Sequence, residues 1–272
     1  LWSTSGFFIK YLTINAFQIS FFRSLIAALT VFFITMARKK KLKFEFDKVS
    51  NFAAIFYAGI LILFVLATKM TTAANAIFLQ FTAPMYLVVL EPLLLKTKFD
   101  SKNVVTIIIC IFGMMLFFFG KLELGNIYGN LLAIASGMCF AMFSLLLKYK
   151  KVKHKNDNTL NNVIMGNVLV AVIAFFVVFP DFTLDLTQSL ILLYMGAIQI
   201  GVSYIIFNEG IKYVSATESM IIATLEAIFN PIWVFVGIGE MPSIYSIFGG
   251  LIIFAAIIWR NFSKKEKSLI IE

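Results

Sequence analysis

The feature that most constrains this chain is a succession of long apolar runs separated by short polar connections. They lie at roughly 1–13, 16–37, 51–68, 72–95, 103–120, 126–148, 160–179, 188–208, 215–239 and 243–260. About 20 helical residues cross the hydrocarbon core of a bilayer, and the strict alternation of a membrane β-barrel is missing. The pattern predicts an all-α polytopic membrane protein with ten transmembrane helices. The first helix is expected to be truncated at its start, because the sequence opens inside an apolar run.

Composition excludes several classes of protein. The chain is 61% hydrophobic and 14% charged, whereas soluble domains are about 45–50% apolar and 25% charged. The net charge of +9 does not indicate nucleic-acid binding, since the basic residues fall between the apolar runs. Cys110 and Cys139 lie inside such runs and are expected to be small core residues. The one histidine, His154, lies in a lysine-rich loop, so we expect no metal site, no cofactor and no catalytic residues.

The distribution of lysine and arginine predicts the orientation. With the N-terminus inside, nineteen basic residues fall in inner loops and the tail, and only Lys69 and Lys121 fall in outer loops. Basic residues concentrate on the cytoplasmic side of membrane proteins. The sequence therefore predicts a multi-pass protein of the cytoplasmic membrane with both termini cytoplasmic. No G-x-x-x-x-G-K-[ST] loop occurs, so no ATPase subunit is indicated.

Five runs precede Gly125 and five follow it, so any internal repeat must be inverted in the membrane. Two short alignments support a repeat. At an offset of 138, Lys10-Tyr11 falls on Lys148-Tyr149; at 143, Ile62, Phe64, Lys69 and Ala73 fall on Ile205, Phe207, Lys212 and Ala216. We expect one five-helix repeat over 1–122, an inverted one over 123–262 and a cytoplasmic tail over 263–272. Inverted repeats are typical of secondary transporters that bind substrate near the midplane.

Several segments carry a resemblance to a known family. Trp2-Ser3, Ile9-Lys10 and Phe22 to Leu29 resemble the first two helices of the EamA branch of the drug/metabolite transporter superfamily. Gly129 to Tyr149, Ala216 to Glu240 and Phe248-Gly249-Gly250 are similar to its second half. The resemblance implies ten helices in two inverted repeats, a central cavity and transport of small metabolites, often amino acid export. The sequence departs from the family at two positions, with Ser3 where glycine is common and Ala227 where proline is common.

The run 215–239 holds the best candidate for a functional residue, Glu226. A carboxylate at the centre of a membrane helix costs roughly 2.5–3.5 kcal/mol on insertion scales, so such residues usually face a cavity. Glu226 is a candidate for proton coupling or for binding a substrate ammonium; a neutral carboxyl that locks two helices together is the alternative. Asn230 and Trp233 share its helical face. Arg23, deep in the second run, could hold a substrate carboxylate or pair with a glutamate.

Further polar and aromatic residues are candidates for lining a substrate cavity. They are Asn75, Gln80 and Tyr86 in the fourth run, Gln199 and Tyr204 in the eighth, and Trp2 in the first. Hydrogen bonding between helices is the competing role for the polar residues, while an aromatic wall suits a substrate cation. Glu91, Glu209 and Glu218, near the cytoplasmic ends of their helices, are expected to be interfacial charges or caps.

These observations predict a secondary transporter of small polar metabolites, most simply an amino acid exporter, that works by alternating access. Kinks near Pro84 and Pro231 would help its two mouths to open. The alternatives are an importer of a nutrient, nucleoside or cofactor precursor, and a lipid-carrier flippase of the same fold; an enzyme is disfavoured because the inner loops are rich in lysine. The expected partners are a small-molecule substrate and the lipid bilayer. No G-x-x-x-G dimer signal lies wholly inside an apolar run, since Gly125 to Gly129 straddles the start of the sixth, and this favours a monomer or a weak homodimer.

Overall fold

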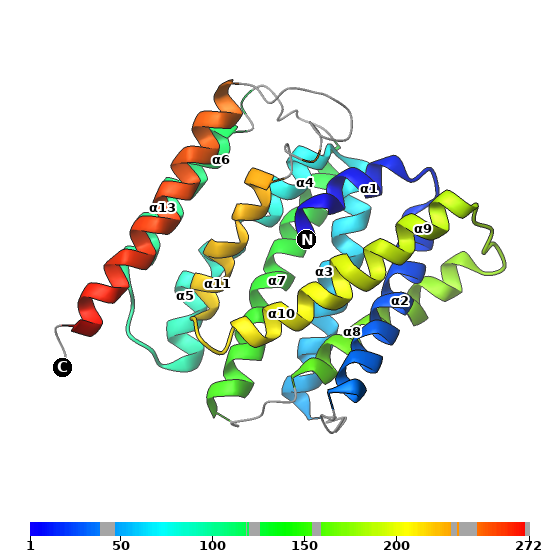
Figure 1. Ribbon diagram of the computed structural model, residues 1–272, viewed down its shortest axis with the longest axis horizontal. Helices are drawn as coiled ribbons and strands as arrows, with labels where there is room; N and C mark the ends of the chain where they lie inside the picture. Colours follow the sequence, from blue (N-terminus) through cyan, green and yellow to red (C-terminus); the bar gives the residue numbers. More distant parts are fainter. Residues whose placement is uncertain are drawn as a thin grey trace.

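The structure, a computed structural model, describes residues 1–38, 47–117, 119, 126–153, 159–229, 233 and 244–269. The described chain is a bundle of helices (Figure 1), and the prediction of an all-α polytopic membrane protein is confirmed. Six stretches are long and apolar enough to cross a membrane, and two shorter apolar helices accompany them.

The first half runs from η1 to α6. Its elements are η1 (Trp2–Thr4), α1 (Ser5–Tyr11), α2 (Ala16–Ala37), α3 (Lys48–Met70), α4 (Ala73–Gln80), α5 (Ala83–Leu95) and α6 (Ser101–Phe117). The second half has α7 (Ile127–Lys153), α8 (Leu160–Val178), α9 (Leu186–Tyr194), the π-helix η2 (Met195–Val202), α10 (Ser203–Gly210), α11 (Ala216–Ala223) and α13 (Ile244–Leu269). Residues 225–229 are also helical. Two ends differ from the predicted runs, since α7 continues to Lys153 and α13 crosses most of the expected tail.

Polar caps define where the helices begin. Asn15, Asp185 and Ser215 each form a reciprocal capping box with the residue three positions later, and Asp47 and Thr72 accept from backbone N–H groups of α3 and α4. Such caps satisfy donors that have no partner within the helix. The short polar connections seen in the sequence therefore stop and restart the apolar helices.

The fourth predicted span is broken rather than continuous. α4 ends at Gln80, and α5 begins at Ala83 after two intervening residues. Pro84 lies in the first turn of α5, where the missing backbone N–H of proline has no partner within the helix to lose. The kink expected near Pro84 thus lies just before it. In the ninth span, α11 ends at Ala223 and a turn at Thr224 precedes the next helical residues. The kink expected at Pro231 lies outside the described residues.

The two broken helices correspond at the offset of 143 found in the sequence. Thr72 and Ser215 are the N-caps of α4 and α11, and both half-helices then run for eight residues. Phe81 and Thr224, the residues at the two breaks, are also 143 apart. The eighth predicted span differs from its counterpart in the first half, which is α3. α3 is one continuous α-helix, whereas the eighth span contains the π-helix η2.

Helices of the two halves pack against one another throughout the bundle. α3 lies beside α7, α2 beside α8 and α6 beside α13, and Figure 1 shows the last pair along one edge of the molecule. Buried apolar side chains form two clusters. One, with Val31, Leu147 and Ile211, lies toward the end that carries most of the described lysines, here called the basic end. The other includes Leu12, Ala67 and Leu192 toward the opposite end and continues between α6 and α13 to Ile257, near the basic end.

Candidate functional site

A small cavity of about 40 Å³ lies deep in the bundle. Its lining residues come from both halves of the chain and are Trp2, Ser5, Arg23, Ile60, Leu61, Phe64, Gln80, Phe140, Ile200, Tyr204 and Glu226. A water needs roughly 10–15 Å³ of such space, so the cavity holds water but no metabolite as it stands. In this conformation the cavity is therefore too small for a substrate.

Arg23 brings a positive charge to this cavity. It lies eight residues into the helix that begins after Asn15, or about 12 Å along its axis, and only 1% of its surface is exposed. Its Nη2 donates to the Leu61 carbonyl at 3.3 Å, and its Nε has no hydrogen-bond partner among the described residues. A guanidinium has five donors, so Arg23 retains capacity for a ligand.

Glu226 brings a carboxyl group to the same cavity from the helical residues after the break at Thr224. No ion pair joins Glu226 to Arg23 in the part of the chain that the structure describes. A guanidinium and a carboxyl group thus line one small cavity without touching. Charges inside a membrane protein almost always pair or face a cavity, and this cavity is where both could find a common partner.

Aromatic rings form one wall of the cavity. The ring of Trp2 lies 4.9 Å from that of Tyr204 and 5.7 Å from that of Phe140, while Tyr57 lies 4.6 Å behind Tyr204. The indole nitrogen of Trp2 is buried and has no partner within the described chain. Trp2 and Glu226 also border a second pocket of about 420 Å³, which Leu1, Ile206 and Phe229 help to line.

Gln80 reaches the cavity from the break between α4 and α5. Its Nε2 donates to Ser136 Oγ at 2.8 Å, and that hydroxyl donates to the Ile60 carbonyl at 3.2 Å. The backbone at the break packs tightly on α7, since a Cβ placed on Gly137 would lie 2.6 Å from the Gln80 carbonyl oxygen. The broken helix is therefore held by specific contacts.

Half of the substrate-binding candidates named from the sequence gather at the cavity, namely Trp2, Arg23, Gln80, Tyr204 and Glu226. Their role in binding stays a prediction. Gln199 lies nearby but donates to Thr4 Oγ1 at 2.7 Å, and its buried Oε1 has no described partner. Asn230 lies outside the described residues.

Three other candidates lie elsewhere. Asn75 donates to Thr71 and Asn130 near the opposite end of the bundle, at 3.2 Å in each case. The Tyr86 hydroxyl lies 3.2 Å from the hydroxyl of Thr82 at the helix break. Trp233 donates its indole N–H to Ser3 Oγ at 2.7 Å. In the described contacts Asn75 and Trp233 join separate elements, which was the competing role for the polar candidates, whereas the Tyr86 contact stays at the start of α5.

Sequence reasoning missed six lining residues, which are Ser5, Ile60, Leu61, Phe64, Phe140 and Ile200. Leu61 takes part through its backbone carbonyl, which carries no signal in the sequence. Phe140 is one of 31 phenylalanines, and only the packing singles it out. Ile200 lines the cavity where Gln199 was expected, because a π-helical turn shifts the face that a residue presents.

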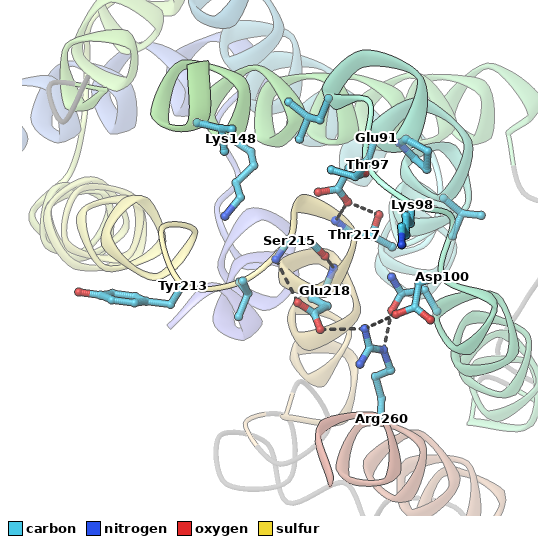
Figure 2. Close-up of a pocket in the computed structure, with 16 residues that line it drawn as sticks. Glu91, Thr97, Lys98, Asp100, Lys148, Tyr213, Ser215, Thr217, Glu218 and Arg260 are labelled. Carbon is cyan, nitrogen blue, oxygen red and sulfur yellow. Dashed lines mark hydrogen bonds and ion pairs between the residues drawn. The ribbon is translucent and has the colours of Figure 1, made fainter. Parts of the chain in front are cut away.

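A second polar cluster lies at the basic end around a pocket of about 380 Å³ (Figure 2). Glu91 caps the N-terminus of α11, Glu218 belongs to its capping box, and Glu209 pairs with Lys212 at 2.9 Å. The prediction of a cap is confirmed for Glu91 and Glu218, while an interfacial position for Glu209 stays a prediction. Among the described residues no group of three metal-ligating side chains is found.

Comparisons with known proteins agree with this architecture. A relative in Archaeoglobus fulgidus, named an uncharacterized transporter, is 22% identical over 94% of this chain and 92% of its own. A second from the same organism is 25% identical over 73% of this chain and 71% of its own. The uncharacterized transporter YxxF of Bacillus subtilis is 24% identical over 94% and 85%.

A solved crystal structure shares the fold, with a TM-score of 0.79 and 13% identity over 94% of this chain and 91% of that one. The profile of the EamA-like transporter family matches residues 1–119 and 127–262, which is nearly the whole chain in two segments. This protein is therefore a multi-pass membrane transporter that belongs to the EamA-like transporter family.

Proposed function

We propose that this transporter moves small zwitterionic metabolites, most simply amino acids outward, across the cytoplasmic membrane by alternating access. The observation that carries the proposal is that two ionisable side chains, Arg23 and Glu226, line one cavity without pairing. Arg23 comes from the first half of the chain and Glu226 from the second. A substrate bound between them would contact both halves.

The two charges complement the two ends of an amino acid. A guanidinium can bind a carboxylate with two parallel hydrogen bonds, and Arg23 has donors that no described residue uses. The Glu226 carboxylate would accept from a substrate ammonium, and the aromatic wall of Trp2 and Tyr204 would favour a cation through its ring faces. Glu226 is also the candidate for proton coupling, since protonation would release the ammonium.

Alternating access is proposed because the cavity is too small for a metabolite in this conformation. Helices would have to separate, on one side at a time, to admit a substrate. The breaks at Phe81 and Thr224 are suited to act as hinges beside the cavity. The matched caps and breaks at an offset of 143 support a pair of inverted repeats, and we propose that the repeats rock against each other.

The basic end is proposed to face the cytoplasm. Arg38, Lys98, Lys148, Lys212 and Arg260 lie at this end of the described chain. Basic residues hold the cytoplasmic ends of membrane helices inside and attract the anionic lipid of that leaflet.

Counterflow of labelled amino acids into proteoliposomes tests the proposal. The wild type is expected to exchange one or more amino acids, and Arg23→Gln is expected to abolish exchange because the carboxylate loses its partner. With Glu226→Gln, loss of proton-driven accumulation with retained exchange would identify the proton carrier; exchange that needs no pH gradient in either protein would indicate a facilitator.

Glu209→Gln is the matched control, because Glu209 pairs with Lys212 outside the cavity. It is expected to transport like the wild type. A folded wild type that exchanges no amino acid would overturn the substrate assignment and direct the search to nucleosides, cofactor precursors and lipid carriers.

A further inference from the structure

The N-terminus of α11 is tied to α5 by a buried carboxylate. Glu91, which is 5% exposed, accepts from the backbone N–H groups of Ala216 and Thr217 at 2.8 Å each. It also accepts from the Thr217 hydroxyl at 2.5 Å. The first N–H groups of a helix have no partner within it, and the helix dipole favours a negative charge there. Glu91, on the neighbouring helix α5, supplies both the hydrogen-bond acceptor and the negative charge.

Arg260 ties the same end of α11 to two further helices. Its Nη2 lies 2.9 Å from Glu218 Oε1 on α11 and 2.8 Å from Asp100 Oδ2, just before α6. Its Nε donates to Asn103 Oδ1 at 2.6 Å. Figure 2 shows Arg260 reaching from α13 to both carboxylates, with Glu91 and Thr217 on the other side of α11. One end of this half-helix is thus fastened to α5, α6 and α13.

These ties stand between a wide pocket and the small central cavity. The pocket of about 380 Å³ opens at the basic end and is large enough for a small metabolite, and Glu91, Thr217, Glu218 and Arg260 line it. Beyond the ties, toward the cavity, Leu87 of α5, Ser144 of α7 and Met220 of α11 are fully buried, and Ser144 Oγ lies 3.9 Å from Met220 Sδ. Separation of α11 from α5 would join the two spaces.

Each of the two half-helices is held by the ties near one end and has a helix break at the other. α5 is held by Glu91 near its basic end and begins at the break after Gln80, while α11 is held at its N-terminus and ends at the turn of Thr224. Both breaks lie at the level of the cavity, where Gln80 and Glu226 reach it. Release of the ties would let each half-helix swing about its break without disturbing the opposite end.

We propose that the Glu91–Thr217 tie and the Arg260–Glu218 ion pair form the gate of this transporter at the basic end, with the pocket of Figure 2 as its vestibule. The gate is closed in this structure and opens when α11 leaves α5. This inference rests on the proposed transport through the central cavity, but it does not depend on which substrate is carried.

The test measures access to a thiol placed behind the gate. Ser144→Cys is introduced into a protein whose Cys110 and Cys139 are changed to serine. Its alkylation by a membrane-impermeant maleimide is followed in vesicles that expose either the basic end or the opposite end. Glu91→Gln removes the charge that holds the α11 N-terminus, so alkylation from the basic end should accelerate on the order of tenfold. Alkylation from the opposite end should not change.

Thr217→Val and Glu209→Gln complete the design. Thr217→Val removes only the hydroxyl bond to Glu91, so a smaller acceleration is expected, and this variant carries the test if Glu91→Gln does not fold. Glu209→Gln changes a carboxylate at the same end that pairs with Lys212, and should leave the rate unchanged.

The outcomes separate the gate from the proposed function. Unchanged alkylation in the folded Glu91→Gln and Thr217→Val proteins, or equal acceleration from both sides, would overturn the gate. Faster alkylation from the basic end without exchange of any amino acid would support the gate and reject the proposed substrate, because the thiol readout needs no substrate.

Discussion

The two ends of the bundle are closed by different chemistry. At the opposite end, Lys10 and Lys69 donate to the carbonyls of Thr71 and Leu12 at 2.8 and 2.5 Å, so α1 and α3 bind each other's C-terminal ends. At the basic end, Lys148 donates to the carbonyls of Ile211 and Lys212 after α10. Lysine bound to helix C-terminal carbonyls is thus common to both ends, as the helix dipole favours.

The two ends of the bundle differ in the carboxylates that join their helices. Glu91, Glu218 and Asp100 join α5, α6, α11 and α13 at the basic end. In the described chain, Asn75 stands at the position 143 residues before Glu218, and it bonds to Thr71 and Asn130 through neutral groups. The shared lysine contacts therefore suit a scaffold, while the carboxylate ties suit a gate that opens at one end.

The largest effect is expected from breaking the charge network at the basic end. Arg260→Met would remove the ion-pair partner Arg260 from Glu218, whose side chain is 6% exposed. Removal of one partner of a buried pair costs about 3–5 kcal/mol, so the unfolding temperature in detergent should fall sharply. Arg260→Met with Glu218→Gln should recover most of the loss. Equal losses in the single and double variants would contradict the role of the pair.

The next largest effect is expected where the halves pack through η2. A Cβ on Gly196 would lie 2.6 Å from Ile26 Cβ and 2.8 Å from the Arg23 carbonyl oxygen, while a Cβ on Gly210 would meet nothing within 4 Å. Gly196→Ala should lower stability by about 1–3 kcal/mol and reduce transport by moving Arg23. Gly210→Ala should be neutral or slightly stabilising. Thermal unfolding and counterflow check both, and similar behaviour of the two variants would refute the close approach.

Removal of the lysine contacts should lower stability less, and by similar amounts at the two ends. Lys10→Met and Lys148→Met each remove a donor to helix C-terminal carbonyls, at opposite ends of the bundle. A net loss of about 0.5–1.5 kcal/mol is expected in each case. Thermal unfolding of both variants would show whether the two ends share a scaffold contact; a severe loss at one end alone would break the comparison.

The smallest effect is expected at Asp47, before α3 at the basic end. Burial raises the pKa of Asp47, but hydrogen bonds from Ser50 and the charge of Lys150 outweigh it and lower the pKa to about 2. Because the folded pKa lies below the unfolded one, the stabilisation is present above about pH 4 and is lost as the pH falls through about 2. Asp47 is 46% exposed, so Asp47→Asn should lower the unfolding temperature only slightly and equally from pH 5 to 8.

Hydrophobic periodicity predicted most of the fold. α2 matches its predicted run of 16–37, and α8 matches 160–179 to within a residue. Asn15 caps α2 through its side chain, and Thr159 holds the N-cap position of α8, so polar residues mark both starts. A kink near Pro84 was predicted, but the interruption of the helix at Phe81 and Thr82 and the π-helix η2 were not. A π-turn has no sequence signature and here accompanies the close contacts of Gly196 and Gly201 with α2, which only the folded structure reveals.

The site residues that the sequence predicted are those whose charged side chains cost free energy to place in a membrane. Arg23 and Glu226 stand out because charges deep in apolar runs need a partner or a cavity, and both line the cavity. Asn75 and Tyr86 were chosen by helical face alone, and the break between α4 and α5 separates those faces. Glu91 binds residues of α11 that lie 125 and 126 positions later in the chain. The sequence therefore suggested that Glu91 is a cap but could not show which helix it caps.

The most direct test of the central claim, that Arg23 and Glu226 bind one zwitterion between them, is competition in wild-type counterflow. An exchanged amino acid is challenged with its unlabelled form, with the amine that lacks the carboxylate, and with the acid that lacks the ammonium. The account predicts strong competition by the amino acid and little by either analogue, with Arg23→Gln inactive toward all. Equal competition by the amine or the acid would contradict the account, because one of the two buried charges would then have no part in binding.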